Sequence, residues 1–254
     1  DGYMSLINRV TEKLPYDTIE NPNAIKRWVI TNCTTSTAKR FLMYLNAACL
    51  EINGTSNFQG MAKQIRERWE EDPDPRILTE DEIREGFKKM NPCYSDFFRF
   101  MLLTGCRPSE ALGLQLSDIS DNQINFQRQR QLTRKGEKVI EKLKTQKKRL
   151  FPMYDQLILQ IDRLLARRSG LGDEPEWLFV DRKGKPLNYS TLRRNWDKFF
   201  PEDTTMYNCR DTFITNQLLK GISSDVVAVW CGNSARVIKK HYQDNSAFVS
   251  VIPR

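Results

Sequence analysis

Histidine is almost absent from this chain of 254 residues, in which His241 is the only one. The 6 cysteines lie far apart, and no two of them form a CxxC pair. These shortages exclude a multi-histidine metal centre and give no sign of a zinc site or a disulfide framework. We therefore expect no bound metal and reduced thiols, as in a cytoplasm.

Long apolar runs and glycine-rich phosphate loops are also missing. No segment approaches the roughly 20 apolar residues that span a bilayer, and no signal-peptide core opens the chain. No loop of the Walker or dinucleotide-binding type occurs. The sequence thus predicts a globular protein without a membrane span or a nucleotide cofactor.

Positive charge is in excess. Lysine and arginine total 40 against 32 acidic residues, which gives a formal net charge of +8. This sign suits a protein that covers nucleic-acid phosphates. The 39% of hydrophobic residues is enough for a buried core.

A proline-rich acidic run at residues 70–75, EEDPDP, indicates a linker, because it discourages both helix and strand. We place a domain boundary there, with domains at 1–72 and 73–254. In the first domain, apolar stripes predict a helix from Asn21-Pro22, another from Thr35 or Ser36 to about Gly54, and a third over about 58–71, with 1–21 irregular.

The second domain reads as mainly α-helical with a small antiparallel β-sheet, an α+β fold. Thr79 to Glu82 form a capping box, and Pro108 suits a first helical position. Alternation around Ile124 and Phe126 predicts a strand. We further predict a hairpin turn at 134–137, a short strand at 177–180, and helices over 153–168, 190–200, 207–220, from Ser223 or Ser224 to Gly232, and 234–242.

Two arginines and a tyrosine carry the candidate chemistry. Arg107 stands at a helix entrance before Pro108, Arg210 in the first turn of a predicted helix, and Tyr242 near a helix end. A tyrosine hydroxyl can attack phosphorus, and arginine can hold two phosphate oxygens while charge builds on them. By themselves, an arginine and a tyrosine at such positions are more often a solvated charge and a half-buried ring.

The surrounding segments are more specific. TGCRPSEALGL at 104–114 resembles the first arginine motif of the tyrosine recombinases, or phage integrases. RDTF, the CGNS turn and HYQD resemble their second motif and nucleophile segment, in the same order. The resemblance spans about 77–244. It implies a tyrosine recombinase catalytic fold preceded by a small helical core-binding domain, which is short here, so we expect part of it to be missing.

The resemblance also implies roles. Tyr242 would attack a DNA phosphate, form a 3′-phosphotyrosyl bond and release a 5′-hydroxyl, without a cofactor. Arg107 and Arg210 would stabilise the phosphorane. Glu110 would orient an arginine, with a plain surface glutamate as the alternative. Lys144 matches the β-hairpin lysine that protonates the leaving oxygen, with Lys142, Lys147 and Lys148 as alternatives.

Three positions depart from the family pattern. Tyr207 and Asn233 stand where histidine is common, and Asp211, a supporting residue, follows the second arginine where histidine is frequent. Tyrosine and asparagine can donate hydrogen bonds, but neither exchanges a proton readily near neutral pH. His241, next to the nucleophile, is a further candidate, so the general base stays open.

The implied partners are double-stranded DNA with a specific recombination site, other copies of the chain in a homo-tetramer, and accessory DNA-bending proteins. The apolar tail at 245–254 would pack on a partner copy or on its own domain. Such a protein would work in the cytoplasm, either associated with the bacterial nucleoid or encoded by a phage or mobile element. The alternatives are a DNA-binding protein of this fold with weakened cleavage, and a type IB topoisomerase. Expected DNA contacts, with a solvated face as the alternative, are Arg134, Lys135, Lys147, Lys148, Arg193 and Arg194.

Overall fold

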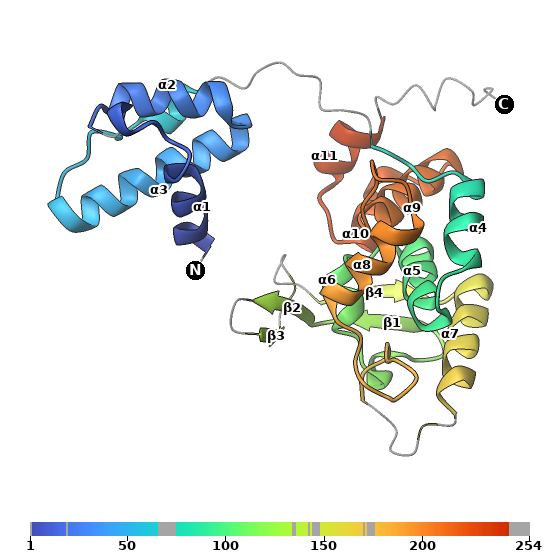
Figure 1. Cartoon of the computed structure of the whole chain (residues 1–254). Helices are drawn as coiled ribbons and strands as arrows, with labels where there is room; N and C mark the ends of the chain where they lie inside the picture. The colour runs from blue at the N-terminus through green and yellow to red at the C-terminus, as the bar shows by residue number, and fades with distance from the viewer. Residues whose placement is uncertain are drawn as a thin grey trace. The chain divides into compact units, whose positions relative to one another are not determined.

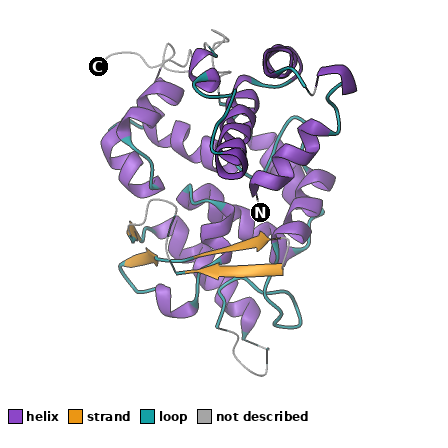
Figure 2. Cartoon of the chain, turned by 90° about the vertical axis from the view of Figure 1, so that its left-hand side faces the viewer, coloured by secondary structure: helices purple, strands orange, loops and turns teal. Residues whose placement is uncertain are grey.

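The computed structural model describes residues 2–18, 20–65, 75–133, 136–141, 143, 148–169, 171 and 176–243. Helices dominate it, with short antiparallel strands in its second part (Figures 1 and 2). The chain forms two compact units, Asp1–Pro73 and Asp74–Arg254. This division falls beside the boundary that we expected after residue 72.

The first unit is a helical bundle with its own core. Asn21 caps α2, since its Oδ1 accepts hydrogen bonds from two backbone amides, and Gly54 ends α3 at φ +68°. Both boundaries were predicted. The core includes Leu6, Val29 and Phe41. The elements are α1 Gly2–Thr11, η1 Tyr16–Thr18, α2 Pro22–Asn32, α3 Thr35–Asn53 and η2 Met61–Gln64.

Two predictions for this unit were wrong. The segment predicted as irregular contains α1, which is held because Leu6 and Val10, one turn apart, are buried in the bundle core. The helix predicted over 58–71 is a turn and the short η2 as far as residue 65, and residues 66–71 lie outside the described part. Gly60 adopts φ +74°, a left-handed conformation that interrupts a helix.

The helices of the second unit begin where local signals place them. The Thr79 capping box is present in full, and Pro108 is the first residue of α6. Ser223 caps α10, and Gly232 ends it in the left-handed region. The helices are α4 Glu80–Lys88, α5 Pro92–Thr104, α6 Pro108–Leu112, η3 Leu116–Asp118, α7 Asp155–Arg168, α8 Tyr189–Phe199, α9 Asn208–Leu219, α10 Ser224–Cys231, α11 Ala235–Ile238 and the π-helical η4 Lys239–Gln243.

The strands form two antiparallel pairs. β1 (Gln123–Phe126) pairs with β4 (Arg149–Pro152), and β2 (Gln129–Thr133) pairs with β3 (Gly136–Ile140). Of the turn predicted at 134–137, Gly136 and Glu137 belong to β3, and Arg134 and Lys135 are outside the described residues. The strand predicted at 177–180 was wrong, because Trp177 and Val180 make only isolated bridges, to Gln115 and Pro186 respectively.

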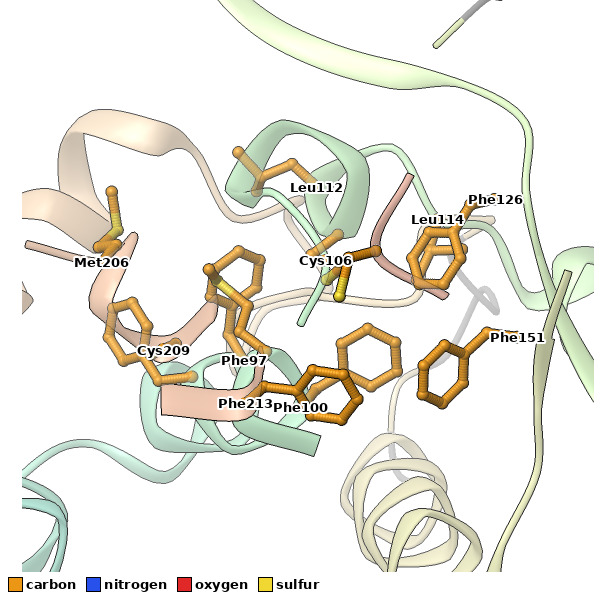
Figure 3. Close-up of a cluster of buried hydrophobic side chains, with 14 of the residues drawn as sticks. Phe97, Phe100, Cys106, Leu112, Leu114, Phe126, Phe151, Met206, Cys209 and Phe213 are labelled. Atoms are coloured by element: carbon orange, nitrogen blue, oxygen red, sulfur yellow. The ribbon is translucent and has the colours of Figure 1, made fainter. Parts of the chain in front are cut away.

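An aromatic core supports the loops of the second unit. In Figure 3, rings from α5, β1, β4 and α9 lie beside Cys106, which is fully buried and follows Gly105 at the end of α5. Trp196 stacks on Phe200 with ring centroids 3.9 Å apart. This core fixes the backbone from which Arg107 projects. The labelled rings are Phe97, Phe100, Phe126, Phe151 and Phe213.

No helix in the described part of the chain is both long and apolar enough to cross a membrane.

Candidate active site

The loop between α5 and α6 positions the first arginine. Gly105 ends α5 at φ +60°, and a Cβ there would lie 2.4 Å from the Phe213 ring. Two residues later, the guanidinium of Arg107 donates to the Gly232 carbonyl oxygen at 3.0 Å and to Asn233 Oδ1 at 3.1 Å. The first motif and the turn after α10, 125 residues apart, therefore meet at one side chain.

Glu110 holds Arg107 from the other side. Its Oε1 accepts from Arg107 Nη1 at 2.7 Å, and its Oε2 accepts from the Arg107 backbone amide at 3.0 Å. The residue is only 1% exposed. Burial raises its pKa, but the charges and hydrogen bonds of Arg149 and Arg107 outweigh burial and keep the pKa below its ordinary value. Glu110 is therefore a buried carboxylate between two arginines.

Arg149 is the member of this site that the sequence reading missed. We assigned it no role from the sequence, but it is only 5% exposed. Its Nη2 donates to Glu110 Oε2 at 3.0 Å, and its guanidinium lies 4.3 Å from the centre of the Phe126 ring. Arg149 alternates with Leu150 and shares the inward face of β4 with Phe151. That alternation was the available signal.

Arg210 contacts the loop between α5 and α6 and is buried, with 5% exposure. Its Nη1 donates to the Gly105 carbonyl oxygen at 2.6 Å. Its Nη2 is buried and has no hydrogen-bond partner among the described residues. Burial lowers the pKa of Arg210, yet a guanidinium remains charged at neutral pH. The site thus contains a buried cationic donor that an anion could satisfy.

Tyr242 is more enclosed than a half-buried ring. It is 7% exposed and belongs to the hydrophobic core. Packing against α9 encloses it. The predicted helix to Tyr242 changes into η4 after Ile238, and π turns are frequent at functional sites.

The hydroxyl of Tyr242 donates to Asp211 Oδ1 at 2.6 Å. Burial raises the pKa of Tyr242 well above its ordinary value, and the charge of Asp211 and this hydrogen bond raise it further. Burial also raises the pKa of Asp211, although the hydrogen bond from Tyr242 and the charge of Arg210 oppose this. The partner of the hydroxyl is therefore Asp211, a residue that we expected only to support the site.

The two other positions that lack histidine differ in exposure. Tyr207 is 46% exposed, and partial burial raises the pKa of its hydroxyl. Asn233 is half-buried and accepts from Arg107, while its backbone amide donates to the Ala228 carbonyl oxygen at 3.0 Å. Asn233 thus orients Arg107 directly.

The remaining predicted residues are less informative. Lys144, Arg134, Lys135 and Lys147 lie outside the described residues. Lys148 is exposed. Arg193 and Arg194 are exposed on α8, where they contact Asp197 and Thr191 of the same helix. Among the described residues, no group of three side chains could hold a metal ion.

Comparisons with known proteins agree on one family. A family model described as the phage integrase family matches residues 76–247. No curated protein matches the chain. Several solved structures have the same fold, at 17–19% identity.

Three of these structures illustrate the similarity. The Tn1549 transposon integrase in complex with transposon right end DNA gives a TM-score of 0.68 at 19% identity, over 93% of this chain and 86% of that one. A lambda integrase tetramer bound to a Holliday junction gives a TM-score of 0.65 at 18% identity, over 93% of this chain and 70% of that one. XerA recombinase gives a TM-score of 0.52 at 17% identity, over 100% of this chain and 91% of that one.

Proposed function

Because the chain belongs to the phage integrase family and is a tyrosine recombinase, we propose that Tyr242 is the nucleophile of its site-specific DNA strand exchange. Arg107 and Arg210 hold the phosphate under attack. Glu110, Arg149 and Asn233 keep Arg107 in position. Tyr207, at the exposed rim, contributes a hydroxyl donor to the DNA.

The unpartnered Nη2 of Arg210 is the observation that supports this most directly. A buried polar group without a hydrogen-bond partner costs about 1 to 3 kcal/mol, or more if it is charged, and a bound anion at this atom would remove that cost. A phosphate oxygen supplies both the missing acceptor and the opposite charge. Arginine binds phosphate oxygens with short, charge-assisted hydrogen bonds.

In the proposed reaction, one bond to phosphorus forms as another breaks. As Tyr242 Oη bonds to phosphorus, the bond from phosphorus to the 5′ oxygen breaks, and negative charge grows on the non-bridging oxygens. Arg107 and Arg210 stabilise that charge where it develops. Lys144 gives a proton to the leaving 5′ oxygen. The phosphotyrosyl bond keeps the energy of the phosphodiester, so rejoining to the 5′-hydroxyl of another strand needs no ATP.

The DNA is held by both units in this proposal. The helical unit, expected at residues 1–72, serves as a core-binding domain on duplex DNA, and Lys148, Arg193 and Arg194 lie along the backbone of the same duplex. Copies of the chain assemble as a tetramer, as lambda integrase does on a Holliday junction. The protein works in a reducing cytoplasm, where its 6 cysteines remain thiols.

A covalent trap tests the proposal. A pool of nicked suicide duplexes with a randomised central sequence is incubated with the protein in EDTA, and denaturant-resistant adducts are isolated and sequenced. We expect a common sequence among the adducts, and Tyr242→Phe should bind that sequence without forming an adduct.

Other outcomes identify the alternatives. Binding without any adduct would indicate a DNA-binding protein of this fold, and adducts without a shared sequence, with relaxation of supercoiled DNA, would indicate a type IB topoisomerase. A requirement for magnesium would contradict the mechanism.

A further inference from the structure

The proposed mechanism leaves one proton without a destination. Tyr242 must lose its hydroxyl proton as its oxygen bonds to phosphorus, and a general base within hydrogen-bond reach makes this step faster. Tyr207 and Asn233 are poor proton acceptors near neutral pH. A base must therefore come from another residue at this site.

The structure offers a carboxylate at the required distance. Tyr242 Oη lies 2.6 Å from Asp211 Oδ1, which is within the range of charge-assisted O–H···O⁻ hydrogen bonds. Asp211 lies in the first turn of α9, next to Arg210, so the second phosphate-binding motif and the nucleophile are joined by this contact. The two residues are 31 positions apart in sequence.

The second carboxylate oxygen of Asp211 also has a hydrogen-bond donor. Its Oδ2 accepts a long hydrogen bond of 3.5 Å from Asn208 Nδ2, and that amide donates at 2.7 Å to the Arg76 carbonyl oxygen. Asn208 is 8% exposed. The carboxylate thus has one oxygen toward Asn208 and one toward the hydroxyl of Tyr242.

We propose that Asp211 is a catalytic residue, the general base that takes the proton of Tyr242 during attack on the DNA phosphate. The inference rests on the proposed function of Tyr242. The Oη–H bond breaks as the bond between Oη and phosphorus forms, and the proton moves to Asp211 Oδ1. When the strand is rejoined, the proton returns from Asp211 to the departing tyrosine oxygen.

The charges around the pair fit this role. Asp211 is faced by Tyr242 from η4 and by Arg210 from its own helix, and Cys231 of α10 also lies within electrostatic reach of Tyr242. Burial raises the pKa of the Asp211 carboxyl, which makes it a stronger base than an exposed aspartate. The raised pKa of Tyr242 keeps its hydroxyl protonated in the resting enzyme, so proton transfer accompanies the attack. Protonated Asp211 then carries no negative charge beside the phosphorane.

The test compares Asp211→Asn with wild type in single-turnover cleavage of a suicide duplex recovered from the randomised pool, at saturating protein. Asparagine can still accept the tyrosine hydrogen bond but is too weak a base to take the proton. We expect cleavage to slow by about 10²- to 10⁴-fold, with DNA affinity unchanged. Asp225→Asn, the same chemical change at an exposed position on α10, should cleave like wild type.

The pH profile gives a readout that positioning alone would not change. Wild-type cleavage should fall on the acid side as Asp211 becomes protonated, and Asp211→Asn should lack this limb. In Asp211→Ala, formate should restore part of the rate because it supplies a small carboxylate base, whereas it should not help Tyr242→Phe. The formate experiment also tests the inference if the Asp211→Asn variant folds poorly.

Three outcomes overturn the inference. The first is a wild-type rate and pH profile in Asp211→Asn. The second is faster cleavage in that variant, which would mean that Asp211 restrains the nucleophile. The third is no rescue of a folded Asp211→Ala by formate. In each case wild type still forms the Tyr242 adduct. Absence of that adduct would instead refute the proposed function, so the two failures are distinguishable.

Discussion

At the scale of single residues, the carboxylate of Glu110 joins two arginines that come from different segments of the chain. It receives hydrogen bonds from Arg107 on one oxygen and Arg149 on the other, at 2.7 and 3.0 Å. All three side chains are largely removed from water, with 17%, 2% and 5% exposed for Arg107, Glu110 and Arg149. Removing one partner from such a group leaves a buried charge without compensation.

Arg149→Leu should therefore destabilise the protein by about 3 to 5 kcal/mol, the usual cost of breaking a buried pair. Urea unfolding followed by circular dichroism measures the change in the free energy of unfolding. Arg193→Leu, on the exposed face of α8, is the matched control and should stay within about 0.5 kcal/mol. Equal stability of the two variants would show that Arg149 contributes no more than a surface arginine.

Asn233 offers a prediction about rate. Its side chain accepts from Arg107, so Asn233→Ala loses a support of that arginine and one donor near the phosphate. We expect single-turnover cleavage to slow about tenfold or more, below the roughly 10²-fold loss of a sole oxyanion donor, because Arg107 and Arg210 remain. Asn233→His should match or exceed wild type. An unchanged rate in the alanine variant would reduce Asn233 to a turn residue after Gly232.

Asp211 should also make stability depend on pH. Its pKa in the folded state lies above the ordinary value near 3.8, so the folded state binds this proton more readily than the unfolded state. The contribution is present below the ordinary pKa and is lost as the pH rises through the raised one. Asp211→Asn should thus melt at a higher temperature than wild type at pH 7, with the difference shrinking in acid. An identical difference at both pH values would argue against a strained carboxylate.

At the scale of elements, the junction between α5 and α6 transmits packing to the arginines. Gly105 combines φ +60° with a close approach to Phe213 and Cys231, whose Sγ would lie 2.9 Å from an added Cβ. Its carbonyl oxygen also accepts from Arg210. One backbone position therefore serves the helix end, the core and the site.

Gly105→Ala should lose about 2 to 4 kcal/mol of stability, from roughly 1 kcal/mol of backbone strain and about 1 to 3 kcal/mol of overpacking. Gly221→Ala separates the two causes, since Gly221 has φ +82° and no atom within 4 Å of an added Cβ. It should show the strain alone. Thermal unfolding of both variants measures the difference, and similar losses would show that the Phe213 contact is easily relieved.

At the scale of the whole molecule, net charge governs the encounter with DNA. The chain carries +8, and a protein that covers several phosphates releases the counterions that had neutralised them. Binding of the full chain to the recovered duplex should weaken steeply with salt, with a log-log slope of roughly −0.9 for each phosphate contacted. Mobility shifts at several salt concentrations measure this slope. A flat response would contradict a clamp around duplex DNA.

The sequence alone determined the features that depend on interactions between residues close together in the chain. The caps of α2, α4 and α10 and the helix ends at Gly54 and Gly232 were predicted because each involves backbone groups within a few residues. The order of the motifs likewise identified the family, since that order lies in the chain itself. Short elements without strong local signals, such as α1, were missed.

Only the tertiary structure decided which distant groups meet. β1 pairs with β4 across the β2–β3 hairpin, and this pairing turns Arg149 inward to Glu110, 39 residues away in sequence. The placement of η4 beside α9 brings Tyr242 to Asp211. Composition and periodicity describe which side of an element is apolar, but the partner of a buried charge depends on how the elements pack. The base that we assign to Tyr242 could therefore be identified only after folding had brought the two residues together.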